Sequence, residues 1–142
     1  MTGVTGPTGP AVTANNLMMF GTSPGTIPNA TVPVTVRVHQ DGTAISPGVQ
    51  GTINLAANQT YYVDYRTNAN STGNVAAALE LDGGPGSVTG SNAVATSNGI
   101  TQVLAGSAII STGATAGNLR LRNDGPLTSN FGSTAINVIK LK

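Results

Sequence analysis

The sequence of 142 residues contains no cysteine, no tryptophan and few charged side chains. Without cysteine the chain has no disulfide framework, no thiolate metal site and no cysteine nucleophile. Charged residues make up 8% of the chain, against about 25% in ordinary soluble domains. The formal net charge of +1 gives no bulk attraction for nucleic acid. We therefore expect a surface of small neutral polar residues, which suits an external coat better than a cytosolic enzyme.

Long apolar runs and leader signals are also missing. No run approaches the length of a membrane span, so no membrane insertion is expected. The opening residues lack the basic segment and apolar stretch of a signal peptide. We interpret Met1 as a recombinant start or a truncation, because the pattern that follows runs directly into it. The aromatic share of 4% means that the core must be built from Val, Ile, Leu and Ala.

Glycine recurs at every third position at the start of the chain: Gly3, Gly6 and Gly9, with Pro7 and Pro10 after two of them. Only glycine fits at the crowded axis of a collagen triple helix, and proline presets its extended backbone. The pattern predicts a collagen-like stub over residues 1–12 and a separate domain over residues 13–142. We expect so short a stub to be disordered. A Gly/Pro-rich tail that has this period by chance is the alternative.

After the stub the pattern changes to period two, which is typical of half-buried strands. No stretch has a sustained helical period with a good cap. The expected strands cover residues 31–38, 51–57, 60–68, 75–82, 100–111, 117–122 and 133–142, with an irregular segment over 83–99. Turn signals such as residues 68–74 separate them. This arrangement predicts an all-β antiparallel sandwich, a jelly roll.

Alternation also assigns side chains to faces. Val32, Val34, Val36 and Val38 share one side of the strand 31–38; Tyr61, Val63 and Tyr65 share one face of 60–68, with Tyr62, Asp64 and Arg66 on the other. Leu119 and Leu121 point inward, and Arg120 and Arg122 point outward. Pro33 predicts an edge or an unpaired position. Gly106 predicts a bulge or a close approach.

The last strand is apolar on both faces. Ile136 and Val138 face one way, and Ile139 and Leu141 face the other. Such a strand is either central in a two-sided core or packed against another subunit. We expect these four residues to form core and trimer contacts.

Several segments, in their order and spacing, resemble a known family. They are the GPT triplets leading into TANNL (13–17), TYYVDYR (60–66), ALELDG (78–83), GITQVLAGSAIIST (99–112), LRLRND (119–124) and INVIKLK (136–142). Together they resemble the C-terminal head of the collagen-like glycoproteins that form filaments on the exosporium, the outer surface of bacterial spores. Animal complement-type heads usually carry cysteine and many aromatics, and this chain departs from them in both respects.

The resemblance implies a jelly roll similar to complement-type and tumour-necrosis-factor-like heads, assembled as a homotrimer with the terminal strand near the three-fold axis. It also implies a spore-surface location and O-glycans, for which Thr5 and Thr8 are the matching positions. In such a protein the head holds three collagen chains in register.

Catalytic and metal-binding patterns are weak. His39 is the single histidine, and we expect it to be exposed beside a turn rather than to serve a serine nucleophile. Glu80 and Asp82, with carbonyls of Gly83 and Gly84, are weak calcium candidates, and pairing of these acids with Arg66, Arg120 or Arg122 is the favoured alternative. Asp64 with Glu80 is a conceivable glycosidase pair. Arg120 and Arg122 could bind an anion. No cofactor is expected.

Our main hypothesis is a non-enzymatic structural protein, the trimerising head of a collagen-like spore filament that mediates surface contact and adhesion to host or environmental ligands. The alternative is the trimeric receptor-binding head of a phage fibre, with a carbohydrate pocket formed by Tyr61, Tyr62 and Tyr65. An enzyme is the weakest hypothesis and would depend on His39.

Overall fold

The computed structural model describes residues 15–82 and 86–142. The predicted stub, with Thr5 and Thr8, lies outside the described residues, as do Gly83 and Gly84. Within the described part the chain is all-β, with one short 3₁₀ turn at Val49–Gly51. None of the described residues forms a helix long and apolar enough to cross a membrane.

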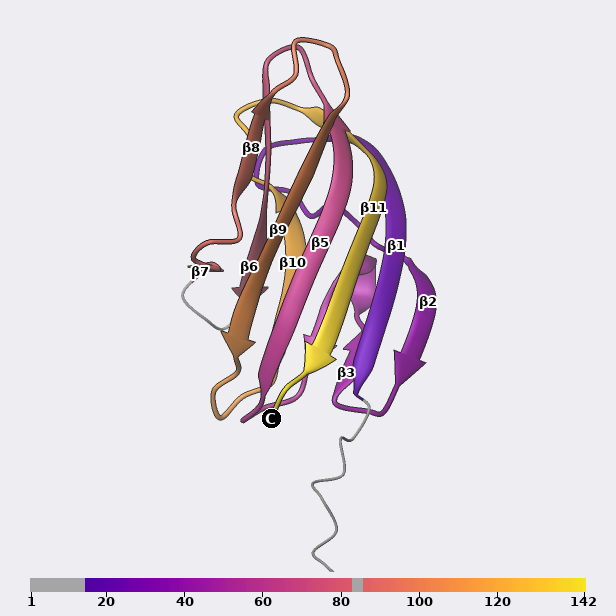
Figure 1. Cartoon of the computed structure of the whole chain (residues 1–142), viewed down its shortest axis with the longest axis vertical. Helices are drawn as coiled ribbons and strands as arrows, with labels where there is room; N and C mark the ends of the chain where they lie inside the picture. Colours follow the sequence, from indigo (N-terminus) through magenta and orange to yellow (C-terminus); the bar gives the residue numbers. More distant parts are fainter. Residues whose placement is uncertain (1–14, 83–85) are drawn as a thin grey trace, which may run out of the picture.

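The strands form two antiparallel sheets that pack face to face (Figure 1). The five-stranded sheet, called sheet A below, has the order β2-β1-β11-β5-β9. Its strands are β1 (Asn16–Thr26), β2 (Val36–Asp41), β5 (Thr60–Asn70), β9 (Gln102–Ser111) and β11 (Ser129–Lys140). The second sheet, sheet B, has the order β3-β4-β10-β6-β7, with β8 also paired to β6. Its strands are β3 (Ile45–Pro47), β4 (Ile53–Leu55), β6 (Asn74–Asp82), β7 (Gly86–Ser87), β8 (Ala93–Thr96) and β10 (Gly117–Asn123). The predicted antiparallel jelly roll is confirmed.

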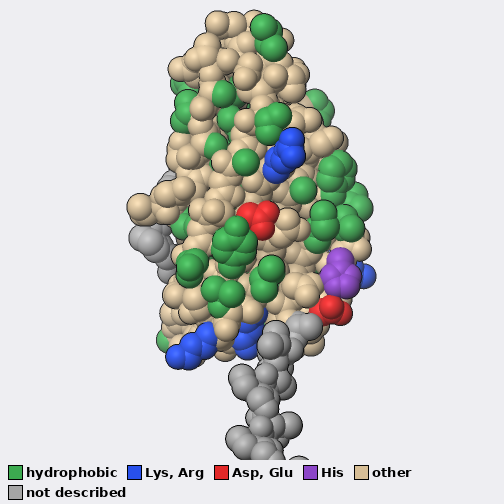
Figure 2. All heavy atoms as spheres, viewed as in Figure 1, with side chains coloured by type: hydrophobic (Ala, Val, Ile, Leu, Met, Phe, Trp, Pro, Cys, Tyr) green, Lys and Arg blue, Asp and Glu red, His purple; other side chains and the backbone are tan. Residues whose placement is uncertain are grey.

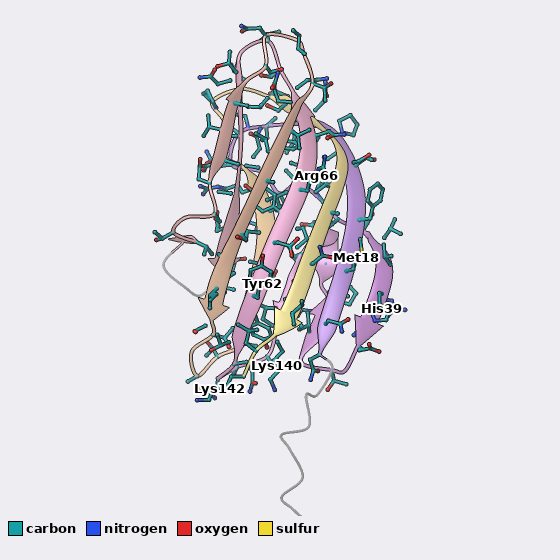
Figure 3. All side chains as sticks on the ribbon, in the orientation of Figure 1. Met18, His39, Tyr62, Arg66, Lys140 and Lys142 are labelled. Carbon is teal, nitrogen blue, oxygen red and sulfur yellow. The ribbon has the colours of Figure 1, made fainter. Side chains whose placement is uncertain are left out.

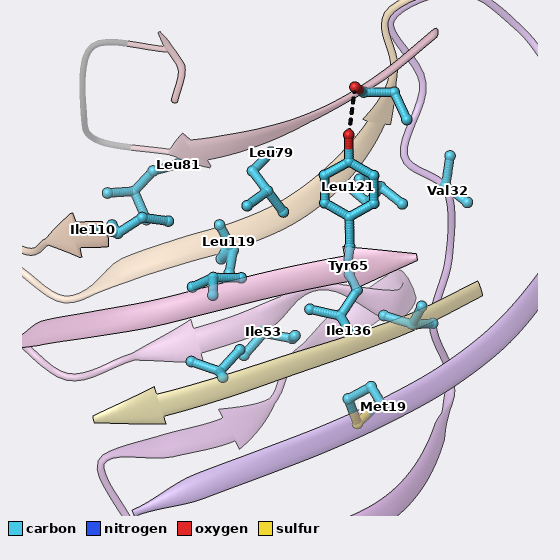
Figure 4. Packing of buried hydrophobic residues seen from close by; sticks show 14 of the residues in the cluster. Met19, Val32, Ile53, Tyr65, Leu79, Leu81, Ile110, Leu119, Leu121 and Ile136 are labelled. Atoms are coloured by element: carbon cyan, nitrogen blue, oxygen red, sulfur yellow. Dashed lines mark hydrogen bonds between the residues drawn. The ribbon is translucent and has the colours of Figure 1, made fainter. Parts of the chain in front are cut away.

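The core lies between the two sheets and consists mainly of aliphatic side chains (Figure 4). Alternate residues of several strands point into it. Leu119 and Leu121 on β10 are buried as predicted, and Tyr61, Val63 and Tyr65, predicted to share one face of their strand, are buried together on β5. On β6 even the alternating alanines Ala76 and Ala78 are buried.

Tyr65 joins the two sheets across this core. Its hydroxyl lies 2.8 Å from the carbonyl oxygen of Ala77 and 2.7 Å from that of Ser91. Gly106 lies directly opposite Tyr65 on β9, with no shift in register. A Cβ at this glycine would lie 2.6 Å from the Ser91 oxygen and 2.7 Å from the Tyr65 ring. Gly106 is therefore a point of close approach, as predicted, and not a bulge.

The predicted single strand over residues 31–38 is wrong. Val32 and Val34 are buried, and their amides donate to Leu121 and Gly51. Only Val36 onward forms a strand, β2, which pairs with β1 at the edge of sheet A, where Val36 is exposed. The chain crosses from sheet B to sheet A between these two halves. The regular alternation of valines therefore continues across the crossing, although Val32 and Val34 are buried and Val36 is exposed. Pro33 lies in the crossing, outside any strand.

Other strand limits differ more modestly from the prediction. Strand β5 continues to Asn70, so the loop after it covers only residues 71–73. Strand β11 begins at Ser129 rather than at residue 133. Strands β1 and β3 were not predicted. Strand β1 gives no alternating signal, because Met18 and Phe20 on its outer side are as apolar as Leu17 and Met19 on its inner side.

Both ends of the described chain lie at the same end of the sandwich (Figure 1). The amide of Lys140 donates to the carbonyl oxygen of Asn15 at 2.8 Å, and the amide of Thr60 donates to that of Lys142 at 2.9 Å. The opposite end of the sandwich carries the loops at residues 71–73 and 97–101. The segment before Asn15 is therefore attached at the end that also holds the C-terminus.

Candidate functional site

The outer face of sheet A is the candidate site, because exposed apolar side chains and isolated charged side chains lie together on it (Figure 2). The strand register aligns its residues in rows across the sheet. One row contains Ile109, Tyr62, Ile139, Asn16 and Asp41. The next contains Ser107, Asp64, Asn137, Met18 and His39. A third contains Ala105, Arg66, Ala135, Phe20 and Val36.

Large apolar side chains on this sheet are open to solvent in the single chain. Ile109 is 68% exposed and Ile139 is 46% exposed. Val103 on β9, Val36 and Val38 on β2, and Leu141 just beyond β11 are also exposed. A surface with this many exposed aliphatic groups on one sheet is typical of a protein–protein contact.

The predicted interface residues divide into two pairs. Ile136 and Val138 are fully buried in the core of the single chain. Ile139 and Leu141 point to the other side and are exposed, so the second apolar face of the terminal strand is not covered within one chain. The assignment of these residues to a trimer contact stays a prediction.

Two shallow hollows flank Asp64 on this face. One of about 380 Å³ includes Met18, His39, Asn137 and Ile139. The other, of about 450 Å³, lies over β5 and β9 and includes Tyr62 and Arg66. Asp64 lines both hollows, so its carboxylate stands between two places where a side chain from outside could enter.

The charged groups near sheet A, of which Figure 3 labels His39 and Arg66, differ in their hydrogen-bond partners. An Asp64 carboxylate oxygen accepts a hydrogen bond from the Asn137 amide at 2.9 Å. His39 lies 2.9 Å from the Asp41 carboxylate, and Arg37 donates to the Gln40 side chain at 3.0 Å. Arg66 is exposed and has no hydrogen bond or ion pair within the described residues.

The outer face of sheet B carries a connected ion network instead. Glu80 accepts hydrogen bonds from Arg120 at 2.6 Å and from Arg122 at 2.8 Å, one on each carboxylate oxygen. Arg122 also pairs with Asp124, which the side chain of Asn92 contacts in turn. The register of β6 against β10, which places Glu80 opposite Arg120, brings these groups together.

This network and the sheet topology bear on three of the weaker sequence hypotheses. Both oxygens of Glu80 are bonded to arginines, which confirms the favoured pairing with Arg120 and Arg122 and leaves none free for calcium. No group of metal-binding side chains occurs among the described residues. The two arginines are paired with acids, so they do not form an open anion site. Asp64 and Glu80 lie on opposite outer faces of the sandwich, and the proposed glycosidase pair is wrong.

The predicted aromatic pocket is also wrong. Tyr61 and Tyr65 are buried, and their hydroxyls lie within hydrogen-bonding distance of backbone carbonyl oxygens. Burial raises the pKa of the Tyr65 phenol well above its usual value of 10.0, and it raises the pKa of Tyr61 in the same direction. Only Tyr62 of the three reaches the outer face.

His39 has the exposed, turn-flanking position that the sequence predicted. Its side chain contacts Asp41 and no serine hydroxyl within the described residues. The sequence did not assign several apolar residues on the outer side of sheet A to an interface. Met18 and Phe20 lie on the unpredicted β1, and Val103 and Ile109 lie on β9, where an apolar-leaning run hid its outward positions.

Comparison with known proteins bears on the fold. No protein-family model matches the sequence, and no curated protein matches it. Among solved structures, the chain is similar to the globular domain of zebrafish complement 1qA, with a TM-score of 0.70 at 9% identity over 90% of this chain and 98% of that one. The chain has the C1q/TNF jelly-roll fold.

Two further solved structures have the same architecture. The Eiger TNF from S. frugiperda gives a TM-score of 0.72 at 12% identity, covering 91% of this chain and 93% of that one. The PRD1 vertex protein P5 gives a TM-score of 0.57 at 18% identity, covering 93% and 99%. At these identities the three likenesses show a shared fold.

Proposed function

We propose that this chain is the trimerising head of a collagen-like filament on the exosporium of a bacterial spore, a non-enzymatic structural glycoprotein that mediates surface contact and adhesion. The sequence resemblance to spore-surface collagen-like glycoproteins and the C1q/TNF jelly-roll fold both support this function. The collagen-like period over residues 1–12 supports the filament part of the proposal.

The outer face of sheet A carries the proposal. Ile139 and Ile109 lie on either side of Tyr62 in one row of this face and are exposed in a single chain. Covering aliphatic surface stabilises an assembly by about 25 cal/mol per Å² removed from water, less the cost of association. Three copies that cover one another's sheet A face would bury these groups and complete the terminal strand on its second side.

The position of the chain ends fits a clamp for a stalk. The segment that precedes Asn15 is attached at the end of the sandwich where the C-terminus also lies. Three heads joined about one axis would therefore bring three collagen-like segments together at one end. Holding the chains in register lowers the entropic cost of starting a triple helix.

Sedimentation equilibrium of the full chain at micromolar concentration tests the assembly. The expected result is a single species of three chains of 14.1 kDa each. A monomer under these conditions would overturn the proposal. Extending the stub with Gly-Pro-Thr triplets then tests whether the head holds the collagen chains together. The triple helix, followed by circular dichroism, should melt at a higher temperature with the head attached than without it. Immunogold labelling of spores tests the location.

The phage-fibre alternative has one point of support, the structural likeness to the PRD1 vertex protein P5. Its predicted aromatic pocket is not formed, because Tyr61 and Tyr65 are buried. A glycan array separates the two functions: saturable binding to a defined carbohydrate, abolished by Tyr62→Ala, would favour the receptor-binding head.

A further inference from the structure

Two charged side chains on the outer face of sheet A lack an ionic partner within the described chain. Asp64 is half-buried and accepts one hydrogen bond, from the neutral amide of Asn137. Arg66 is exposed and bonds nothing among the described residues. Both project outward from β5, separated by two residues or about 6.6 Å of strand. Each chain therefore presents one acid and one base on the same face.

The neighbours of these two residues supply no opposite charge. Arg66 stands between Ala135 on β11 and Ala105 on β9, whose small side chains leave the guanidinium uncovered. Asp64 stands between Asn137 and Ser107 in the adjacent row. The hollow of about 450 Å³ beside them leaves room for a side chain from another molecule.

The other cations of sheet A are already bonded or lie elsewhere. Arg37 donates to Gln40, and His39 contacts Asp41. Lys140 and Lys142 lie at the end of the sheet beside the C-terminus (Figure 3). Within the described part of the chain, Arg66 is thus the cation on this face that is available to a partner.

We propose that Arg66 of one copy forms an ion pair with Asp64 of the next copy around the ring. This inference rests on the proposed trimer, in which the face is covered. Burying either charge alone is costly, whereas a guanidinium paired with a carboxylate keeps its hydrogen bonds. In a cyclic assembly each chain gives Arg66 to one neighbour and Asp64 to the other, so that both residues of every chain are paired. The pair fixes the register of the heads and excludes arrangements that place like charges together.

The test uses two charge reversals in the full chain, Asp64→Lys and Arg66→Glu, each prepared alone. Each reversal places like charges at every contact of the ring, and we expect the concentration of half-dissociation to rise about tenfold or more. In a mixed trimer one contact joins the introduced lysine to the introduced glutamate, one restores Arg66 with Asp64, and the third keeps like charges. With two of its three contacts matched, the mixed trimer is expected to assemble at a lower concentration than either variant requires alone.

Mixing separates a contact between chains from one within a chain. If Asp64 and Arg66 served each other in the same chain, each variant would keep its own like-charged pair, and mixing would restore nothing. Asp82→Lys is the matched control, since it makes the same charge change at an exposed position of sheet B and should leave assembly unchanged.

Three outcomes overturn the inference in distinguishable ways. A wild-type monomer removes the proposed function together with the ion pair. A wild-type trimer whose two reversal variants assemble equally well removes the ion pair alone, as does loss of assembly without rescue on mixing. If a reversal fails to fold, the neutral variants Asp64→Asn and Arg66→Gln replace it. A double-mutant cycle on trimer dissociation must then show a coupling between the two positions that weakens with added salt.

Discussion

On the outer face of sheet B, Glu80 accepts hydrogen bonds from Arg120 and Arg122 at 2.6 and 2.8 Å, whereas on the outer face of sheet A the guanidinium of Arg66 bonds nothing within the described residues. The strands of the two sheets differ in apolar exposure as well. Ile109 and Ile139 lie open on sheet A, while on sheet B Ala76 and Ala78 of β6 are covered and Val94 of β8 is exposed.

This difference shows which surface a single chain completes by itself. On sheet B the side chains of Arg122 and Glu80 are only 18% and 12% exposed, and their charges are matched locally. On sheet A, Ile109 and Ile139 are uncovered, and Asp64 and Arg66 have no ionic partner within the described part of the same chain. Changes on sheet B should therefore alter the stability of the fold, and changes on sheet A should alter association.

The largest effect is expected for Ile139→Asp. A carboxylate at this position would be buried without a partner in the trimer. The concentration of half-dissociation should therefore rise about a hundredfold or more. Because Ile139 is already half-exposed in one chain, the monomer should still fold. Leu141→Asp is expected to act in the same direction. Light scattering gives the mass, and circular dichroism confirms the fold.

Val94→Asp is the matched control for this change, because Val94 is 63% exposed on β8 of sheet B. Its mass should equal that of the wild type. The assignment of the assembly contact to sheet A would be wrong if Ile139→Asp kept the molar mass of the wild-type assembly, or if both variants dissociated to the same extent.

A smaller effect, on stability rather than assembly, is expected for Glu80→Gln. This change removes the charge that Arg120 and Arg122 share. The free energy of unfolding should fall by about 2–3 kcal/mol, since hydrogen bonds between charged groups are replaced by weaker ones. Urea denaturation measures the loss. An unchanged midpoint would mean that water satisfies these arginines equally well.

Tyr65→Phe tests the layer between the faces. At neutral pH this change should lower the free energy of unfolding by about 1–3 kcal/mol, because the carbonyl oxygens of Ala77 and Ser91 lose the hydroxyl donor. The raised pKa of Tyr65 also predicts a pH dependence. The unfolded tyrosine ionises near pH 10.0 while the folded one stays protonated, so stability is full below that pH and falls as the pH rises above it.

The measurement for Tyr65→Phe is a series of urea denaturations between neutral and strongly alkaline pH. The variant should lose less stability than the wild type as the pH rises, although Tyr61 keeps a share of the effect. Parallel curves for the two proteins would show that Tyr65 does not set the alkaline limit.

The smallest effect is expected for Arg120→Ala. Glu80 keeps its bond to Arg122, and Arg120 is the most exposed member of that trio at 26%. We expect the free energy of unfolding to fall by less than about 1 kcal/mol and the assembly to stay unchanged. A loss as large as that of Glu80→Gln would indicate that the network acts as a single unit.

The alternation of side chains was sufficient to assign the faces of a strand where that strand has one buried face. Tyr61, Val63 and Tyr65 were assigned to one face of their strand and lie together in the core, because alternate side chains of a strand must point to opposite sides. The pattern failed on β1, where both faces are apolar and no alternation marks the strand. It also failed at residues 31–38, where the backbone changes sheets in the middle of a regular alternation.

The sequence by itself determined the all-β class, the faces of most strands and the two apolar sides of the last strand. These properties follow from the order of side chains along one chain. Only the tertiary structure decided that Glu80 meets two arginines, that Asp64 lies on the opposite side of the molecule, and that Tyr65 is a core residue bonded across the sheets. Those contacts depend on strand register and on which sheet each strand joins, which are set by pairing between distant segments.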